Sequence, residues 1–305
     1  MDALITSLVH SGFAPERILP RAVMAQYTTF RVGGEADVLV QIASPEEIPV
    51  ALRAARAANV PVTVIGNGSN LLVRDGGIRG LVLRVASDMA AIRREGDLLI
   101  AQAGATLRAC AQFARAQGMD GLAELSGIPG TIGGSAIMNA GAYGGELSQF
   151  VQRVDAIALS DGKPLSFTGD ALDYGYRHSA MMDAGVIVTQ VTLRLAPGDP
   201  QAIAERMEQV SRMRREKQPI DRPSAGSTFK RPQGLFAAKL IDDCGLRGLR
   251  IGDAQVSEKH TGFIVNLGHA TAGDILALID EVTLRVREQT GVTLEPEVRI
   301  LGEEP

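Results

Sequence analysis

A serine lies in a short, turn-like stretch between basic residues, in the sequence "RPSAGSTFKRP" from Arg222 to Pro232. The glycine and prolines around it favour a turn, in which Ser227 could be a nucleophile, a phosphate ligand, a proton donor or only a turn residue. The nucleophile interpretation is disfavoured because "AGSTF" lacks the G-x-S-x-G elbow. The four histidines show no triad pattern either: His10, His178, His260 and His269. Taken alone, the stretch favours a turn serine.

Two glycine-containing segments could hold phosphate groups. "GNGSNLLVRDGG" directly follows an apolar, strand-like stretch, and residues 127–145 contain seven of the 34 glycines, where an even spread would place about two. Adjacent glycines let backbone N–H groups converge on an anion. Neither segment matches G-x-G-x-x-G, and the chain has no G-x-x-x-x-G-K-[ST] motif. With five polar side chains, the segments predict a site for a large phosphate-bearing ligand: Ser69, Asn70, Thr131, Ser135 and Asn139.

The elements that must position these loops are predicted from apolar periodicity and from capping residues. Helices are expected over residues 44–59, 106–118, 199–219 and 271–291, and a shorter one in "GLFAAKLIDDCG". Ser44 is the expected N-cap of the first of these, and Thr271 and Gly291 mark the two ends of the last. The stretch "VPVTVIG" predicts a strand buried on both faces. A domain boundary is expected near residues 197–200.

Composition limits the class of protein. The 305 residues are 45% hydrophobic and 22% charged, and the net charge is -4, which argues against a nucleic-acid binder. No apolar run approaches the roughly 18 residues needed to cross a bilayer, and the N-terminus has no basic region of a secretory signal. Cys110 and Cys244 form neither a disulfide framework nor a metal site, and Cys110 falls on the apolar face of its helix. We therefore expect a cytoplasmic enzyme with no metal, membrane or obligate protein partner.

Seven motifs in order along the chain resemble those of the UDP-N-acetylenolpyruvoylglucosamine reductases, the flavoenzymes of peptidoglycan precursor synthesis. They are "TTFRVGGEADVLV", "GNGSNLLVRDGG", "SGIPGTIGGSAIMNAGAYG", "YGYRHS", "AGSTFKRP", "AQVSEKHTGFIVN" and "LEPEVRILG". The resemblance implies an α+β fold. An FAD-binding domain of the vanillyl-alcohol-oxidase (PCMH) type would cover residues 1–197, in two α/β subdomains of about residues 1–58 and 59–197. A C-terminal α/β substrate-binding domain would cover residues 198–305.

The same resemblance implies the cofactors. NADPH would be the hydride donor, and FAD would be bound without a covalent bond, because the first glycine loop contains no histidine. The residues implied to wrap FAD are Gly66, Asn67, Gly68, Ser69, Asn70 and Leu71 in the first loop, and Ile128, Pro129, Gly130, Thr131, Gly133, Gly134, Ala136, Asn139 and Gly141 in the second.

Three catalytic residues are implied by the motifs: Arg177, Ser227 and Glu297. Hydride transfer to C3 of the enolpyruvyl group would leave a carbanion at C2, delocalised into the neighbouring carboxylate. A guanidinium suits this planar negative charge, and a protonated carboxyl could donate a hydrogen bond to it. The enolate is so basic that even a serine hydroxyl could protonate C2, provided that its oxygen is held close to that carbon.

The resemblance also implies a set of substrate-binding residues: Tyr176, Lys217, Lys230, Arg231, His260 and Asn266. Residues 178–216 contain no tyrosine, so the chain resembles the short form of the family, which lacks a tyrosine-bearing loop over the substrate. Two other functions stay open at this point. One is a flavin-dependent oxidase of a sugar or alcohol, which would produce peroxide, and the other is a non-catalytic binder of a nucleotide sugar, which would not bind flavin.

Overall fold

The computed structural model describes residues 1–305, which form two compact units that are each discontinuous in sequence. The first unit comprises Met1–Pro20, Val38–Asn67 and Gly80–Met213, and the second comprises Arg21–Asp37, Gly68–Arg79 and Arg214–Pro305. Each unit has its own hydrophobic core. The chain enters the second unit for the last time inside helix α6, Pro200–Lys217. The boundary near residues 197–200 stays a prediction.

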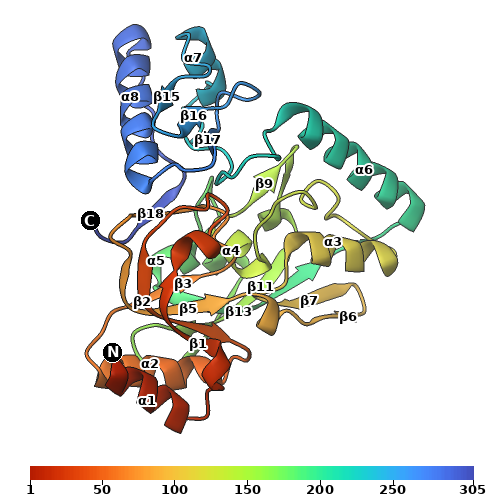
Figure 1. Ribbon diagram of the computed structural model, residues 1–305. Helices are drawn as coiled ribbons and strands as arrows, with labels where there is room; N and C mark the ends of the chain where they lie inside the picture. The colour runs from red at the N-terminus through yellow and green to blue at the C-terminus, as the bar shows by residue number, and fades with distance from the viewer. The chain divides into compact units, whose positions relative to one another are not determined.

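A four-stranded sheet lies beside the two N-terminal helices (Figure 1). Its strand order is β1-β2-β5-β3, with β1 at Ile18–Val23, β2 at Glu35–Ile42, β5 at Ile78–Val85 and β3 at Val62–Ile65. Strand β3 is parallel to β5 at the edge of the sheet, and only Ile65 of its residues is buried. The prediction that this strand is buried on both faces was therefore wrong, because an edge strand is covered on fewer sides.

Helices α1, Asp2–His10, and α2, Glu47–Ala57, run side by side and bury Leu8, Ile48 and Leu52 in the first core. Helix α2 begins three residues later than Ser44. The Glu47 carboxylate accepts a hydrogen bond from the Ala43 N–H (2.9 Å) and pairs with Arg17 (2.7 Å). This acidic side chain therefore holds the entrance of the helix in place of the predicted serine cap.

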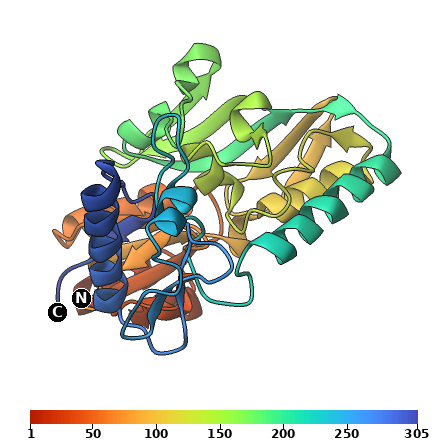
Figure 2. The same ribbon diagram turned by 90° about the horizontal axis from the view of Figure 1, so that it is seen from above.

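A five-stranded antiparallel sheet forms the other part of the first unit, in the order β12-β11-β13-β7-β6. The strands are β6, Ile92–Glu95; β7, Leu98–Gln102; β11, Val151–Ala158; β12, Pro164–Thr168; and β13, Val186–Arg194. Helix α3, Leu107–Ala116, is capped by Thr106, and α6 lies alongside it (Figures 1 and 2). Cys110 is fully buried, as predicted, and burial raises the pKa of its thiol to about 12. It is a core residue.

Short elements complete the first unit. They are α4, Ile132–Ile137; α5, Ala180–Asp183; the paired strands β8, Met119–Asp120, and β14, Ala196–Pro197; and the hairpin of β9, Gly141–Ala142, with β10, Gly145–Glu146. Five 3-10 turns occur along the chain: η1, Pro15–Arg17; η2, Met24–Gln26; η3, Ser87–Met89; η4, Leu147–Gln149; and η5, Gly169–Leu172.

In the second unit, helix α8, Ala272–Thr290, packs on a small antiparallel sheet next to α7, Ala237–Asp243 (Figure 1). The sheet consists of β15, Arg250–Ile251; β16, Ala254–Val256; and β17, Ile264–Asn266. Helix α8 has the predicted ends, because Thr271 accepts from the Asp274 N–H (3.0 Å) and Gly291 closes the helix with φ of +75°. Strand β18, Arg299–Leu301, pairs in parallel with β4, Leu71–Val73.

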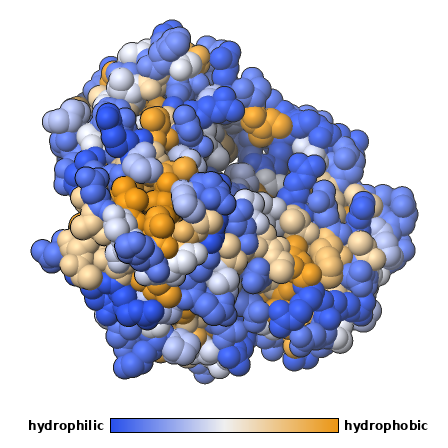
Figure 3. Space-filling view, turned by 60° about the horizontal axis from the view of Figure 1, so that its bottom comes forward, coloured by the Kyte–Doolittle hydropathy of each residue, from blue (hydrophilic) through white to orange (hydrophobic).

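The face shown in Figure 3 is predominantly hydrophilic, with apolar residues gathered in separate patches. Phe236 and Ile220 are the most exposed large apolar side chains of the chain, at 58% and 53%. Among the helices, none combines the length and the apolar character that a bilayer span requires.

Candidate active site

The two glycine-containing segments lie against each other in the first unit. The side-chain N–H of Asn67 donates to the Pro129 carbonyl at 3.4 Å. A Cβ atom at position 66 would lie only 2.6 Å from Thr131 Oγ1, so this approach requires glycine. Thr131 in turn caps α4, where its Oγ1 accepts from the Gly134 N–H (3.3 Å). Two loops that the sequence could only suggest as partners therefore form one cradle.

The chemistry of this cradle fits a phosphate-bearing cofactor. Its contacting groups are glycine backbone, a threonine hydroxyl and an asparagine amide, and none of them carries negative charge. Backbone that can be approached closely and neutral hydrogen-bonding groups are what a diphosphate requires. The first loop continues past Asn67 into the second unit, to which Gly68, Ser69, Asn70 and Leu71 belong.

Arg177 lies at the tip of a tight turn in the first unit. Gly175 and His178 close the turn with reciprocal backbone hydrogen bonds of 3.1 and 3.3 Å. Arg177 has φ of +54°, a left-handed conformation that is uncommon for a non-glycine residue. Its guanidinium lies 5.2 Å from the ring centre of Tyr176 and donates to the Asn139 carbonyl at 3.4 Å. The Arg177 side chain is half-buried, and these two contacts fix the direction in which its guanidinium points.

Of the two tyrosines in this motif, only one is accessible. Tyr176 is 49% exposed, whereas the Tyr174 hydroxyl is buried without a hydrogen-bond partner, and burial raises its pKa. The ring of Tyr174 packs against the first core. A contact with substrate is therefore open to Tyr176 and not to Tyr174.

Ser227 and Glu297 lie on adjacent segments of the second unit. Phe229 and Pro296 form an antiparallel bridge, and the Glu297 N–H donates to the Thr228 carbonyl at 2.8 Å. Ser227 is exposed and directly follows Gly226, whose φ is +79°. The structure therefore brings together two of the three residues for which catalytic roles are implied, although 70 positions separate them in sequence.

Thr228 fixes the position of the serine that precedes it. Its side chain is 1% exposed, and its Oγ1 accepts from the Ile264 N–H at 3.0 Å. Its own N–H donates to the Gly262 carbonyl at 2.8 Å. The segment with Ser227 is thus hydrogen-bonded to the His260 loop on one side and to the Glu297 segment on the other. Thr228 could not be identified from the sequence, because its hydrogen-bond partners are distant along the chain.

Asn70 connects the first glycine loop to the Glu297 segment within the second unit. Its side-chain N–H donates to the Glu297 carbonyl at 3.2 Å, and its carbonyl accepts from the Arg299 N–H at 2.9 Å. The loop then continues into β4, which pairs with β18. A residue expected to bind the cofactor therefore also braces the backbone of Glu297.

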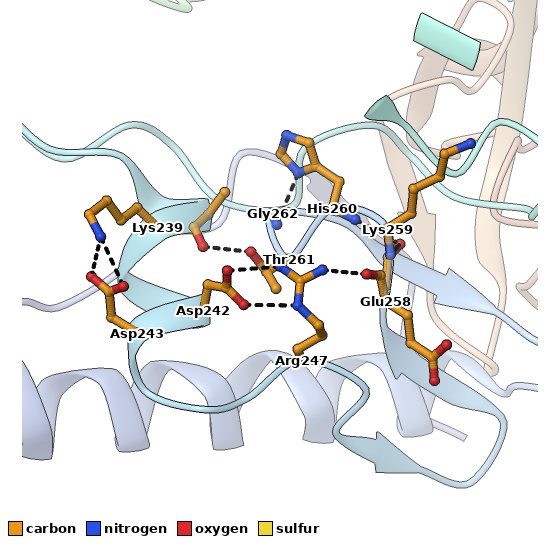
Figure 4. Close-up of polar contacts among 11 residues, drawn as sticks. Lys239, Asp242, Asp243, Arg247, Glu258, Lys259, His260, Thr261 and Gly262 are labelled. Carbon is orange, nitrogen blue, oxygen red and sulfur yellow. Dashed lines mark hydrogen bonds and ion pairs between the residues drawn. The ribbon is translucent and has the colours of Figure 1, made fainter. Parts of the chain in front are cut away.

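The His260 ring is held by a hydrogen bond from the backbone two residues further along the chain (Figure 4). Its Nδ1 accepts a hydrogen bond from the Gly262 N–H at 3.2 Å, so the proton of the neutral imidazole is on Nε2. Phe263 meets the ring edge-on at 5.0 Å between ring centres. Burial, together with the positive charge of Arg247, lowers the pKa of His260.

The loop that carries His260 is braced from α7. Arg247 donates to the Glu258 carbonyl and forms an ion pair of 2.8 Å with Asp242, as Figure 4 shows. The Thr261 hydroxyl donates to the Ala238 carbonyl at 2.5 Å. These contacts leave the position of the imidazole little freedom.

The other expected substrate residues divide into two groups. Lys217 ends α6 and is exposed, Lys230 pairs with Glu295 (3.1 Å), and the Arg231 guanidinium lies 4.9 Å from the Phe236 ring centre. These three cations remain accessible to an anion.

Asn266, by contrast, is 2% exposed and its amide is used inside the second unit. It donates to the Phe30 carbonyl (3.1 Å) and accepts from the N–H groups of Gly268 (2.8 Å) and Ala270 (3.1 Å). Its side chain therefore holds the fold of the second unit together and has little capacity left for a ligand.

A groove of about 470 Å³ also lies in the second unit. It is formed by the segment that follows Lys217 and by the outer face of β16 and β17, and its lining includes Arg215, Arg222, Gln255, Lys259 and Val265. Ser227 and Glu297 are not among the residues that line it.

Models of two protein families match separate parts of the chain. A family model described as the C-terminal domain of UDP-N-acetylenolpyruvoylglucosamine reductase matches residues 218–301, and one described as an FAD-binding domain matches residues 36–168. A reductase of that name from Clostridium tetani is 44% identical over 300 residues, covering 98% of this chain and 97% of the relative. The chain belongs to the UDP-N-acetylenolpyruvoylglucosamine reductase family.

Other members agree with this assignment over nearly the full length. The reductase of Levilactobacillus brevis is 46% identical over 297 residues, covering 97% of each chain. The crystal structure of UDP-N-acetylenolpyruvylglucosamine reductase from Thermus caldophilus aligns with a TM-score of 0.79 at 38% identity, covering 94% of this chain and 98% of that one. The expected fold, an FAD-binding domain of the PCMH type followed by the C-terminal domain of this reductase family, is confirmed.

Proposed function

We propose that this chain catalyses the NADPH-dependent reduction of the enolpyruvyl group of UDP-N-acetylenolpyruvoylglucosamine, which yields UDP-N-acetylmuramate for peptidoglycan precursor synthesis. The observation that carries the proposal is the adjacency of Ser227 and Glu297, on segments joined by the 2.8 Å hydrogen bond from the Glu297 N–H to the Thr228 carbonyl. A hydroxyl and a carboxyl on adjacent segments suit a reaction that ends with protonation of a carbon next to a carboxylate. FAD, when bound, supplies hydride transfer from NADPH to the substrate.

The cofactor would be held by the cradle of the two glycine loops. Gly66, Asn67 and Thr131 would present backbone N–H groups and short polar side chains to its diphosphate. Non-covalent binding is supported because the loop of residues 66–77 contains no histidine.

Ser227 would donate the proton to C2 of the substrate. An alcohol is a weak acid, so the enolate must be very basic and the oxygen must be held close to the carbon. Hydrogen bonds on both sides of Thr228, to Gly262 and to Glu297, provide that fixed position. The exposed hydroxyl of Ser227 remains accessible to a substrate.

Arg177 and Glu297 would stabilise the negative charge that hydride arrival creates. The guanidinium presents several donors in one plane, which matches a carboxylate or its enolate. A protonated Glu297 would add a hydrogen bond to the same charge. The left-handed backbone of Arg177 supports this assignment, because such strain is retained where a side chain must point in one direction.

The nucleotide end of the substrate would be bound by cations. Lys217 and Arg231 would meet the diphosphate, with Tyr176 and His260 as neutral contacts. Lys230 would join them by exchanging Glu295 for phosphate, because its ion pair is exposed on both sides and such pairs contribute little. The two free cysteines, Cys110 and Cys244, support a reducing cytoplasm as the place of action.

Product analysis in heavy water tests this function. With NADPH and the enolpyruvyl nucleotide sugar, the purified protein should form the lactyl ether with a solvent deuterium at C2. Oxygen consumption with peroxide formation, and no such product, would indicate the oxidase instead. A protein that stays colourless after incubation with FAD would indicate a non-catalytic binder.

A further inference from the structure

Asn139 is a buried polar residue whose side chain is fully engaged within the first unit. It is 2% exposed. Its amide N–H groups donate to Glu146 Oε2 at 3.2 Å and to the Gly175 carbonyl at 3.0 Å, and its Oδ1 accepts from the Ser148 N–H at 3.1 Å. An asparagine amide has two N–H donors, so none remains for a ligand. The resemblance implies that this residue binds FAD, whereas both side-chain N–H groups are engaged within the protein.

The side-chain amide and the backbone carbonyl of Asn139 both contact the turn that carries Arg177. The Asn139 side chain is bonded to Gly175, which closes the turn that carries Arg177, and the Asn139 carbonyl accepts from Arg177 Nη1 at 3.4 Å. One residue therefore holds the base of the turn and the guanidinium at its tip. Asn139 itself has φ of +43°, a conformation that asparagine tolerates better than most residues.

The partners of Asn139 are themselves fixed. The Glu146 carboxylate accepts from the Gln149 backbone, and the Gln149 side chain accepts from the Glu146 N–H at 3.2 Å. The Ser179 hydroxyl donates to the Ile137 carbonyl at 2.7 Å, so a second bond joins the same two segments next to Arg177. The amide of Asn139 thus connects a rigid loop to the arginine turn.

We infer that Asn139 is a positioning residue for Arg177. It sets the direction in which the guanidinium meets the substrate carboxylate, and it supports the turn in which the arginine has its left-handed conformation. This inference rests on the proposed role of Arg177, and it assigns Asn139 to the reaction of the substrate rather than to the binding of the cofactor.

Asn139→Gly tests the inference, because glycine adopts the left-handed backbone readily and keeps the carbonyl while the three side-chain bonds are lost. FAD content, measured by absorbance, and the rate of flavin reduction by NADPH should stay within twofold of the unchanged protein. Oxidation of the reduced protein by the enolpyruvyl substrate should slow on the order of 10²-fold, which is the cost of a misplaced catalytic group. Binding of substrate to the oxidised protein, followed by the flavin spectrum, should weaken as well.

Asn59→Gly is the matched control. Asn59 is exposed, also has a left-handed backbone with φ of +53°, and lies in the connection after α2. It should leave both half-reactions unchanged. A double variant of Asn139→Gly with Arg177→Lys should be little slower than Arg177→Lys alone, because both changes disturb one unit.

Three results would overturn the inference. Loss of FAD with a normal substrate step would make Asn139 a cofactor ligand. An equal decrease in both half-reactions, or a fully additive double variant, would indicate a general structural role. The proposed function fails separately, since in that case the unchanged protein would not be reoxidised by the enolpyruvyl substrate at all.

Discussion

The proposed role of Ser227 as an acid depends on the position of its hydroxyl, because an alcohol is a weak acid. The hydrogen bonds of Thr228 to Ile264, Gly262 and Glu297 fix the turn on three sides. A general acid must lie within hydrogen-bond distance of the atom that it protonates, and correct placement of reacting groups can supply much of a rate enhancement. The proposed proton transfer from Ser227 therefore depends on the hydrogen bonds that support its backbone.

Glu297→Gln should lower kcat about 10- to 100-fold and leave KM nearly unchanged. The amide keeps the shape of the side chain but is a weaker donor to a developing anion than a carboxylic acid, and loss of one such donor costs on the order of 10²-fold. Steady-state kinetics with the enolpyruvyl substrate provide the measurement.

Glu295→Gln is the control for this prediction. Glu295 lies two positions away, is exposed, and pairs only with Lys230 at the surface, so kcat should change by less than about twofold. An increase in KM at constant kcat for Glu297→Gln would instead mean that the carboxyl binds the substrate without acting on the anion.

His260 predicts a pH dependence of folding stability. Its pKa is lowered in the folded protein from the ordinary value of 6.5, because burial and Arg247 disfavour the imidazolium. The unfolded chain therefore binds the proton more readily, so protonation favours unfolding and stability should decrease as the pH falls below about 6.5. Protonation of Nδ1 would also break the hydrogen bond from Gly262.

Thermal unfolding between about pH 7.5 and pH 5.5 measures this effect. His260→Gln should flatten the decrease of Tm toward acid pH, because glutamine does not titrate. His10→Gln, at an exposed histidine of α1, should leave the slope as it is. Equal slopes for the unchanged protein and His260→Gln would contradict the assignment.

Single residues with local partners could be predicted from the sequence, and those with distant partners could not. Thr271, Gly291 and Cys110 follow from capping and periodicity, which involve neighbours within a few positions. The side-chain hydrogen bonds of Asn139 and Asn266 could not be predicted from the sequence. Their partners, such as Gly175 for one and Phe30 for the other, are brought near only by folding.

At the scale of elements, the approach of the two glycine loops decides whether a cofactor site exists. Each loop has a tight-turn interpretation by itself, and only the 2.6 Å space beside Thr131 Oγ1 shows why position 66 must be glycine. The sequence predicts both loops but not their contact, because 65 positions separate Thr131 from Gly66. Their pairing depends on the packing of the first unit.

Gly66→Ala should therefore separate the loops and reduce the amount of FAD bound after purification by at least about tenfold. A methyl group at 2.6 Å from Thr131 Oγ1 is closer than van der Waals contact permits, so one loop must move. The ratio of flavin absorbance to protein absorbance is the measurement.

Gly273→Ala offers a control in the first turn of α8, where a Cβ atom would meet nothing closer than 3.5 Å. That variant should keep its full flavin content. If Gly66→Ala retained FAD as well, the two loops would not form the cofactor cradle.

At the scale of the whole molecule, the chain is assembled from units that interrupt each other. Residues 21–37 and 68–79 belong to the second unit although they precede most of the first. Parallel pairing of β4 with β18 and the bond from Asn266 to the Phe30 carbonyl fix these stretches within that unit. Composition and periodicity carry no information on such pairings, so only the resemblance to a family could anticipate the domains.

The discontinuity of the two units divides the first glycine loop. The first glycine loop begins in the first unit with Gly66 and Asn67, and continues in the second, where Asn70 donates to the carbonyl of Glu297. One short segment of chain therefore carries both Gly66, which contacts Thr131, and Asn70, which contacts the Glu297 segment.

Ser227 is proposed to protonate the substrate after the hydride has arrived. An anaerobic, two-step measurement with Ser227→Ala tests this proton transfer. The protein is first reduced with NADPH, and the enolpyruvyl nucleotide sugar is then added while flavin absorbance is followed. Reduction should proceed at the normal rate, and reoxidation should slow by about 10²- to 10⁴-fold. Ser224→Ala, three residues away in the same loop, should behave as the unchanged protein. Reoxidation of Ser227→Ala at the normal rate, or an equal decrease in both steps, would contradict the account.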